Sequence, residues 1–145
     1  MADTDRAARR LAERLLPDPD GRDAFLRALT AGDAARPAVV WRDPRQPTPW
    51  EPLPPLPWQQ PFVDAVPEGA RPGRDPLHDA GAYYCLDLSS AFAARPLADL
   101  PPEPELVVDV CAAPGGKSVL AFRTLAPRLL VCNETIGKRR GALDG

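Results

Sequence analysis

The sequence is poor in lysine, histidine and cysteine, and each shortage argues against a class of protein. Lys117 and Lys138 are the only lysines among 18 basic residues, and the formal net charge is −2, so no global basic field indicates a nucleic-acid partner. The single histidine, His78, has no second ligand spaced nearby and is expected in a loop. The three cysteines form no CxxC pair, so we expect no metal site.

Long hydrophobic runs are also absent. No apolar stretch approaches the ~20 residues that a membrane span needs, and the polar N-terminal residues MADTDRAARR precede no apolar core of a signal peptide. An odd number of cysteines without regular spacing is typical of reduced thiols. We therefore expect a cytoplasmic protein without a membrane partner.

The N-terminal residues show helical spacing of apolar side chains. This spacing predicts helices over residues 4–16 and 22–30, with Gly32 as a stop, and residues 38–41 are expected to form a short strand. Four arginines surround the apolar face of the first helix, and a solvated face is favoured over an RNA-binding one. These arginines are Arg6, Arg9, Arg10 and Arg14.

Proline, in contrast, is abundant, with 20 among 145 residues against the usual ~5%. Residues 45–61 read RQPTPWEPLPPLPWQQP. Because proline fixes φ and removes a hydrogen-bond donor, this segment is predicted to be extended chain. Trp50 and Trp58 within it are expected to pack the segment onto the domain, in preference to stacking on bases.

The middle of the chain carries weaker signals. Residues 62–65 are expected to form a short strand, and residues 67–76 a loop rich in Gly, Pro and Arg. Residues 81–92, GAYYCLDLSSAF, are interpreted as a tight entry into a helix that is capped by Asp87, Ser89 or Ser90 and runs to about residue 94.

The most informative stretch is residues 105–118, ELVVDVCAAPGGKS. Residues 106–110 form a continuous apolar run with one Asp, which predicts a strand buried on both faces of a parallel sheet. Small and turn-forming residues follow, and then a helix is expected over residues 117–126, stopped by Pro127. Such a strand, glycine turn and helix presents backbone N–H groups to a ligand. Residues 128–132 predict a second strand, and residues 137–143 a further basic helix.

Three ligand classes fit this unit. A phosphate-binding P-loop needs a first glycine at position 111, where the chain has Cys, and the dinucleotide pattern G-x-G-x-x-G is absent. The third class is S-adenosylmethionine, whose ribose is bound by an acid at the end of the next strand. Glu134 lies 19 residues after Gly115, close to the ~20-residue spacing expected of such an acid, so this class is favoured.

Residues 109–118, DVCAAPGGKS, resemble the cofactor motif of the NOP/Sun family of RNA cytosine-C5 methyltransferases, of the bacterial RsmB/RsmF type. Residues 81–90 resemble the segment before that motif, and residues 133–134 resemble the end of the family's second strand. The resemblance covers about residues 55–143. It implies that S-adenosylmethionine is bound by Cys111, Ala112, Ala113, Pro114, Gly115, Gly116, Lys117 and Glu134.

The same resemblance points to what this chain lacks. In the family, a cysteine thiolate adds to C6 of cytosine and thereby activates C5, and a second cysteine helps to release the product. Both lie on later strands, in Pro-Cys and Thr-Cys settings, which none of Cys85, Cys111 and Cys132 has. Leu86 also stands where the family often has Gln. We therefore expect no catalytic residue in this chain and no activity from it alone.

The predicted fold class is α/β, with the first strand–helix–strand unit of a Rossmann-like S-adenosylmethionine-dependent methyltransferase sheet. Residues 1–60 are expected to form a helical, proline-rich accessory region, and residues 61–145 to begin the methyltransferase domain. Because two parallel strands leave faces and edges uncovered, we expect an incomplete domain, from a truncated product or a split gene.

The predicted function is therefore methylation of RNA at cytosine C5, with ribosomal RNA as the expected substrate and rRNA processing as the context. The alternative is a non-catalytic RNA- or cofactor-binding fragment that acts with a separate chain carrying the rest of the catalytic domain. Coding sequence downstream with Pro-Cys and Thr-Cys motifs would favour a broken or split enzyme, and its absence the fragment.

Overall fold

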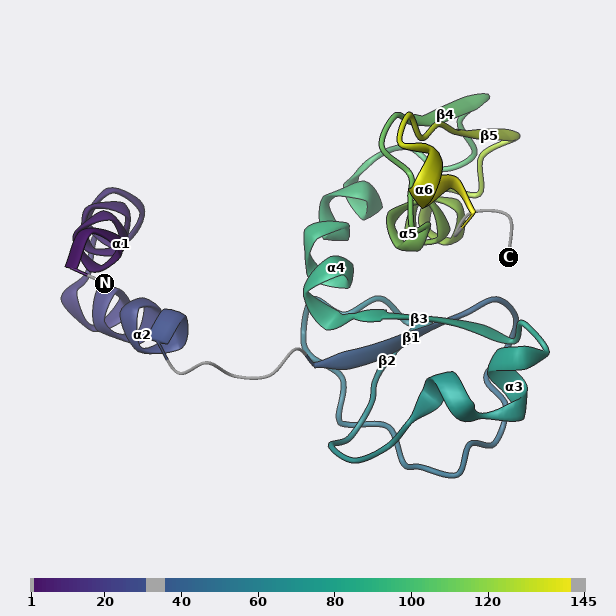
Figure 1. Cartoon of the computed structure of the whole chain (residues 1–145), viewed down its shortest axis with the longest axis horizontal. Helices are drawn as coiled ribbons and strands as arrows, with labels where there is room; N and C mark the ends of the chain where they lie inside the picture. Colours follow the sequence, from purple (N-terminus) through teal and green to yellow (C-terminus); the bar gives the residue numbers. More distant parts are fainter. Residues whose placement is uncertain (1, 31–35, 142–145) are drawn as a thin grey trace. The chain divides into compact units, whose positions relative to one another are not determined.

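The computed structural model of the chain describes residues 2–30 and 36–141, which belong to two compact units, 1–34 and 35–145 (Figure 1). Each unit is described by itself. The boundary predicted between the accessory region, residues 1–60, and the methyltransferase domain, residues 61–145, falls inside the second unit. Within the described ranges, no helix is both long and apolar enough to span a bilayer.

The first unit is a pair of helices, α1 (Ala2–Leu15) and α2 (Pro19–Thr30), as the sequence predicts. Helix α2 begins three residues earlier than expected. The reason is local, since the carboxylate of Asp18 accepts a hydrogen bond from Gly21 N at 2.5 Å, and proline is favoured in a first helical turn. The stop expected at Gly32 lies outside the described residues.

The second unit contains a three-stranded antiparallel sheet in the order β2-β1-β3. The central strand β1 (Pro37–Trp41) and its neighbour β2 (Val63–Ala65) confirm the two short strands expected there. The prediction that residues 81–92 form only a tight entry into a helix is wrong in its first half. Residues Tyr83–Asp87 form strand β3, which pairs with β1 along its full length. Helix α4 (Leu88–Ala93) begins only afterwards, and the predicted cap is confirmed, with Asp87 Oδ1 accepting from Ser89 N at 2.8 Å.

The proline-rich segment forms neither helix nor strand over residues 45–61, as predicted. Its tryptophans pack onto the domain, which confirms that expectation. Trp50 packs edge-to-face against Tyr83, with 6.1 Å between ring centroids, and Trp58 packs in the same way against Phe92, with 5.0 Å between centroids. Three short helical segments follow β2, and His78 lies in the second of them and not in a loop. These segments are η1 (Pro72–Arg74), α3 (Pro76–Asp79) and, after α4, η2 (Arg95–Asp99).

The predicted strand–helix–strand unit is confirmed. Strands β4 (Leu106–Asp109) and β5 (Leu129–Cys132) pair in parallel and are connected by helix α5 (Gly116–Leu125). Helix α5 ends at Leu125, and the next residue, Ala126, adopts a left-handed conformation with φ of 48° just before Pro127. A short helix α6 (Gly137–Arg140) confirms the start of the expected C-terminal helix. The fold is thus mixed α/β, and its placement in the Rossmann-like class remains a prediction.

The expectation that β4 is buried on both faces is wrong. Leu106 and Val108 are 53% and 51% exposed, and on β5 Leu129 and Val131 are 56% and 41% exposed. Helix α5 packs on the two strands, but no described element covers these four side chains. A run of apolar residues indicates that a strand can be buried on both faces. It does not show whether a second layer of structure is present to cover the outer face.

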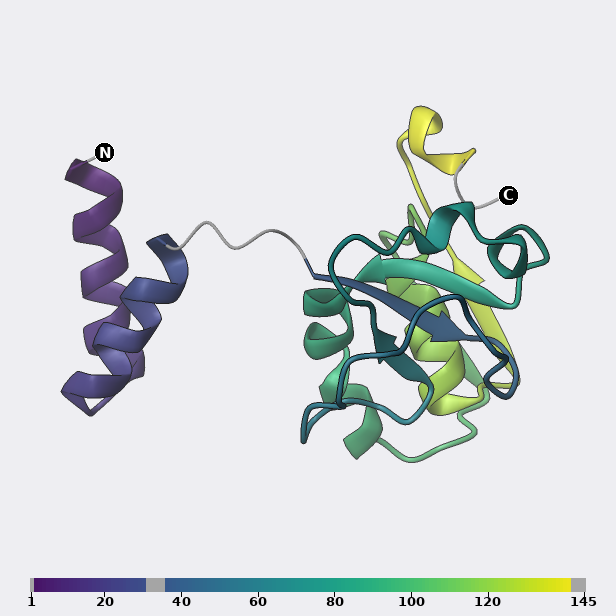
Figure 2. The same cartoon turned by 90° about the horizontal axis from the view of Figure 1, so that it is seen from below.

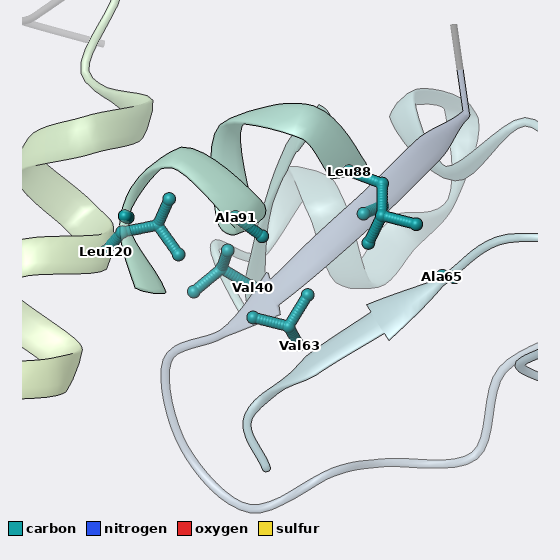
Figure 3. Close-up of a cluster of buried hydrophobic side chains, with 8 residues drawn as sticks. Val40, Val63, Ala65, Leu88, Ala91 and Leu120 are labelled. Atoms are coloured by element: carbon teal, nitrogen blue, oxygen red, sulfur yellow. The ribbon is translucent and has the colours of Figure 1, made fainter. Parts of the chain in front are cut away.

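Helix α5 also packs against the antiparallel sheet, so it lies between the two sheets (Figures 1 and 2). Leu120 is fully buried and reaches the cluster that Val40, Val63 and Ala91 form (Figure 3). The two sheets therefore share one helix, and the position of α5 relative to the antiparallel sheet depends on this contact.

Replacing Leu120 with alanine is expected to lower the free energy of unfolding by ~2–5 kcal/mol, because it leaves a cavity in this cluster. Leu129→Ala is a matched control, since its side chain is 56% exposed, and it should cost less than ~1 kcal/mol. Urea unfolding of both variants measures the difference. Equal losses would contradict the role assigned to Leu120.

Candidate functional site

The loop between β4 and α5 is fixed by the last residue of β4. Asp109 Oδ2 accepts a hydrogen bond from the hydroxyl of Ser118 at 2.7 Å, and its Oδ1 accepts from Cys111 N at 3.1 Å. One carboxylate thus joins the end of the strand, the start of the loop and the first turn of the helix. No role of Asp109 was predicted from the sequence, although an acid that ends an apolar strand is a signal that could have indicated one.

Two glycines shape the second half of the loop. Gly115 has φ of 118°, which a residue with a side chain rarely adopts. A Cβ on Gly116 would lie 3.5 Å from Tyr84 Cε1, so the backbone passes close to the ring of that tyrosine. The first turn of α5 leaves backbone donors available, because no acceptor among the described residues receives the amides of Gly116 and Lys117.

The other predicted loop residues divide into buried and exposed ones. Ala112 and Ala113 are 3% exposed, while Cys111, Pro114 and Lys117 are exposed. The loop is tied to the end of β5, since Ala112 N donates to Asn133 O at 2.9 Å and Asn133 Nδ2 donates to Val110 O at 3.1 Å. The structure therefore brings the ends of β4 and β5 together, as expected for a parallel pair.

Glu134 lies two residues after the end of β5, and its side chain is only 4% exposed. Its Oε1 accepts a hydrogen bond from Ile136 N at 2.8 Å. Its Oε2 lies 3.4 Å from Arg139 Nη1 but has no hydrogen-bond partner among the described residues. Arg139 also donates to Ala113 O, so one guanidinium connects Glu134 with the loop. No pattern in the sequence predicted this contact, because Arg139 is one of several cations in a basic segment.

A small pocket of about 160 Å³ separates the loop from β3 and α4. Tyr84, Leu86 and Ser90 line one side, and Pro114, Gly116 and Lys117 line the other. The hydroxyl of Tyr84 donates to Pro114 O at 3.0 Å. Burial, aided by Cys85, raises the pKa of Tyr84, which keeps that donor protonated. Tyr84 thus supports the loop, a role that was not predicted from the sequence, and Leu86 adds an apolar side chain to this wall.

The three cysteines differ in environment. Cys85 is half-buried on β3, and burial raises the pKa of its thiol. Cys111 in the loop and Cys132 at the end of β5 are both exposed. Among residues 2–30 and 36–141, no three His, Cys, Asp or Glu side chains gather as a metal ion would require.

Comparison with known proteins gives partial matches. No family model matches the chain. Over 52 residues, 36% of the chain, it is 48% identical to the tRNA (cytosine(34)-C(5))-methyltransferase, mitochondrial, of Danio rerio. Over 98 residues, 65% of the chain, it is 34% identical to the Ribosomal RNA small subunit methyltransferase F of Pectobacterium atrosepticum.

Both relatives are RNA methyltransferases by name, and the first is named for cytosine C5. The matched segments cover 14% and 20% of these relatives, so the chain spans about a fifth or less of their length. The resemblance expected from the motif is confirmed in this coarser form. The chain is similar to RNA methyltransferases over part of its sequence.

Alkylation should separate the three thiols. With iodoacetamide at neutral pH, Cys111 and Cys132 are expected to react before Cys85, because Cys85 is less accessible and its raised pKa leaves less thiolate. The rate at Cys85 should rise as the pH increases toward that pKa. Mass spectrometry of peptides sampled over time measures the three rates, and early labelling of Cys85 would contradict the structure.

Proposed function

We propose that this chain carries the S-adenosylmethionine-binding part of an RNA cytosine-C5 methyltransferase. The observation that carries the proposal is the pairing of a glycine loop at the end of β4 with a buried carboxylate, Glu134, at the end of the parallel strand β5. Ligands of parallel α/β sheets bind at the carboxyl ends of the strands. The partial similarity to two RNA methyltransferases supports the same function.

Glu134 fits the ribose of this cofactor. Each carboxylate oxygen can accept two hydrogen bonds, and Oε2 receives none from the described residues. Arg139 Nη1 lies 3.4 Å from Oε2 as an ion-pair partner, and a ligand hydroxyl that donates to Oε2 would supply the hydrogen bond that this contact does not make. The two adjacent ribose hydroxyls are such donors. The contact of Oε1 with Ile136 N holds the carboxylate in place for them.

The loop fits the remainder of the cofactor. Residues 111–117 border the ends of both strands, and Gly115 and Gly116 have no side chain to keep a ligand away from the backbone. The unpaired amides of Gly116 and Lys117, together with the exposed ammonium group of Lys117, suit the carboxylate of the amino-acid part. When bound, S-adenosylmethionine supplies an electrophilic methyl group.

Ribosomal RNA is the proposed substrate, because the relative matched over the larger share of this chain is named for ribosomal RNA. We place this activity in the cytoplasm. None of the three cysteines is proposed as the nucleophile: Cys111 belongs to the cofactor loop, Cys132 ends β5, and Cys85 has a raised pKa. The thiolate chemistry is therefore assigned to residues outside this chain.

A second candidate is a non-catalytic fragment that binds the cofactor or RNA and acts with a partner chain. The exposed apolar side chains on the β4–β5 sheet favour it, because contiguous apolar surface on a sheet is typical of a contact face. These side chains are Leu106, Val108, Leu129 and Val131. The two candidates share the cofactor site and differ in catalysis.

Calorimetric titration with S-adenosylmethionine tests the shared claim. Glu134→Gln keeps a carbonyl oxygen that can accept from Ile136 N but removes the negative charge, and it should weaken binding by about tenfold, as expected for one charge-assisted hydrogen bond. Glu105→Gln is the matched control, since Glu105 is exposed and paired with Arg128, and its affinity should be unchanged. A folded wild-type chain without measurable binding would contradict the proposal.

Incubation with ribosomal RNA and cofactor labelled on its methyl group tests catalysis. We expect no incorporation above background from this chain alone, because no thiol in it has the required setting. Binding of cofactor without incorporation fits the assignment of the nucleophile to another chain or segment. Robust incorporation by this chain alone would overturn that assignment and the second candidate together.

A further inference from the structure

A second pocket, of about 360 Å³, lies beside the C-terminal half of α5. Two arginines, two aromatic residues, two prolines and one acid line it: Arg45, Arg123, Trp41, Phe62, Pro44, Pro61 and Asp43. Arg123 is seven residues along the helix from Gly116, which corresponds to about 10 Å of rise. The pocket shares no lining residue with the one beside the glycine loop.

Both arginines are held in place by the protein. Arg123 Nη1 donates to Arg42 O at 2.5 Å, and its guanidinium carbon lies 5.1 Å from the centroid of the Phe62 ring. Arg45 binds Asp64 through Nε and Nη2, at 2.7 and 2.6 Å. Each guanidinium keeps N–H groups that these contacts do not use. A ligand that meets side chains already ordered loses less conformational entropy on binding.

The pocket carries an uncompensated positive charge. Asp64 is neutralised by Arg45 and accepts from Trp41 Nε1 at 2.7 Å, and Asp43 forms an ion pair with Arg42 at 2.9 Å. Arg123, in contrast, has no acidic partner within the described part of the chain, and its Nε is buried without an acceptor. An anion in the pocket would supply the missing charge.

We infer that this pocket binds one nucleotide of a single-stranded RNA. The phosphate is taken by the free N–H groups of Arg123 and Arg45, and the base or ribose packs on the Phe62 ring and the two prolines. Arginine beside an aromatic face is a recurrent combination for single-stranded nucleic acid, because it offers charge and a flat apolar surface together. The choice of RNA over other anionic ligands rests on the proposed function.

Fluorescence anisotropy with a labelled single-stranded RNA hexamer tests the inference. Arg123→Met keeps the aliphatic stem but removes the charge, and it should weaken binding about tenfold, as expected on losing one charge-assisted contact. Arg128→Met is the matched control, because Arg128 is 74% exposed and paired with Glu105 outside the pocket. Equal affinity of Arg123→Met and wild type, or an equal loss in both variants, would overturn the inference.

A second measurement keeps the test independent of how Arg123→Met folds. In heteronuclear NMR of the wild-type chain, cytidine 5′-monophosphate should shift the indole N–H signal of Trp41, which lines the pocket. The indole N–H signals of Trp50 and Trp58, which do not line it, serve as internal controls. Absence of a shift at Trp41 with saturating nucleotide would overturn the inference.

Cofactor titration of Arg123→Met separates the two proposals. Unchanged S-adenosylmethionine affinity together with weakened RNA binding supports a second site. The wild-type chain could fail to bind S-adenosylmethionine while Arg123→Met still weakens RNA binding. That result would contradict the proposed function, but the pocket beside α5 would still be a nucleotide-binding site. Loss of cofactor binding in Arg123→Met would show that the pocket is not separate from the loop.

Discussion

The packing of helix α5 between two sheets is the constraint on which the second unit depends. Leu120 closes the cluster with Val40 and Val63, while the first turn of the same helix is tied to β4 through Ser118 and Asp109. The helix therefore cannot shift to suit one sheet without disturbing the other. Since the glycine loop is continuous with α5, the geometry of the candidate site follows from the core contact at Leu120.

Much of the fold could be predicted because its signals are local. The apolar runs of β4 and β5, the glycines before α5 and Pro127 after it lie within one stretch of sequence. Strand β3 could not be found in this way, because Tyr83–Asp87 becomes a strand by pairing with Pro37–Trp41, more than 40 residues earlier. The exposure of Leu106 and Leu129 was not predicted for a related reason. Whether a sheet face is buried depends on a second layer of structure packing on it, and the sequence of the strand does not show whether that layer is present.

The candidate site shows the same division. Its loop and Glu134 could be placed from the motif and from the spacing to the end of the next strand. The side chains that hold the loop in place could not be predicted, because their hydrogen bonds join residues far apart in the sequence. Tyr84 bonds to Pro114, 30 residues away, and Arg139 bonds to Ala113, 26 residues away. These contacts come from two different elements, β3 and α6. Their common effect is to fix the backbone of a loop whose own residues are mostly too small to fix it.

The central claim is that the ends of β4 and β5 form one cofactor site. Hydrogen–deuterium exchange of the chain with and without S-adenosylmethionine tests it most directly, because it reports where a ligand binds. The account predicts slower exchange on binding in residues 111–119 and 133–137, with little change in the proline-rich segment. Unchanged exchange in both of these segments at saturating cofactor, or protection confined to other parts of the chain, would contradict it.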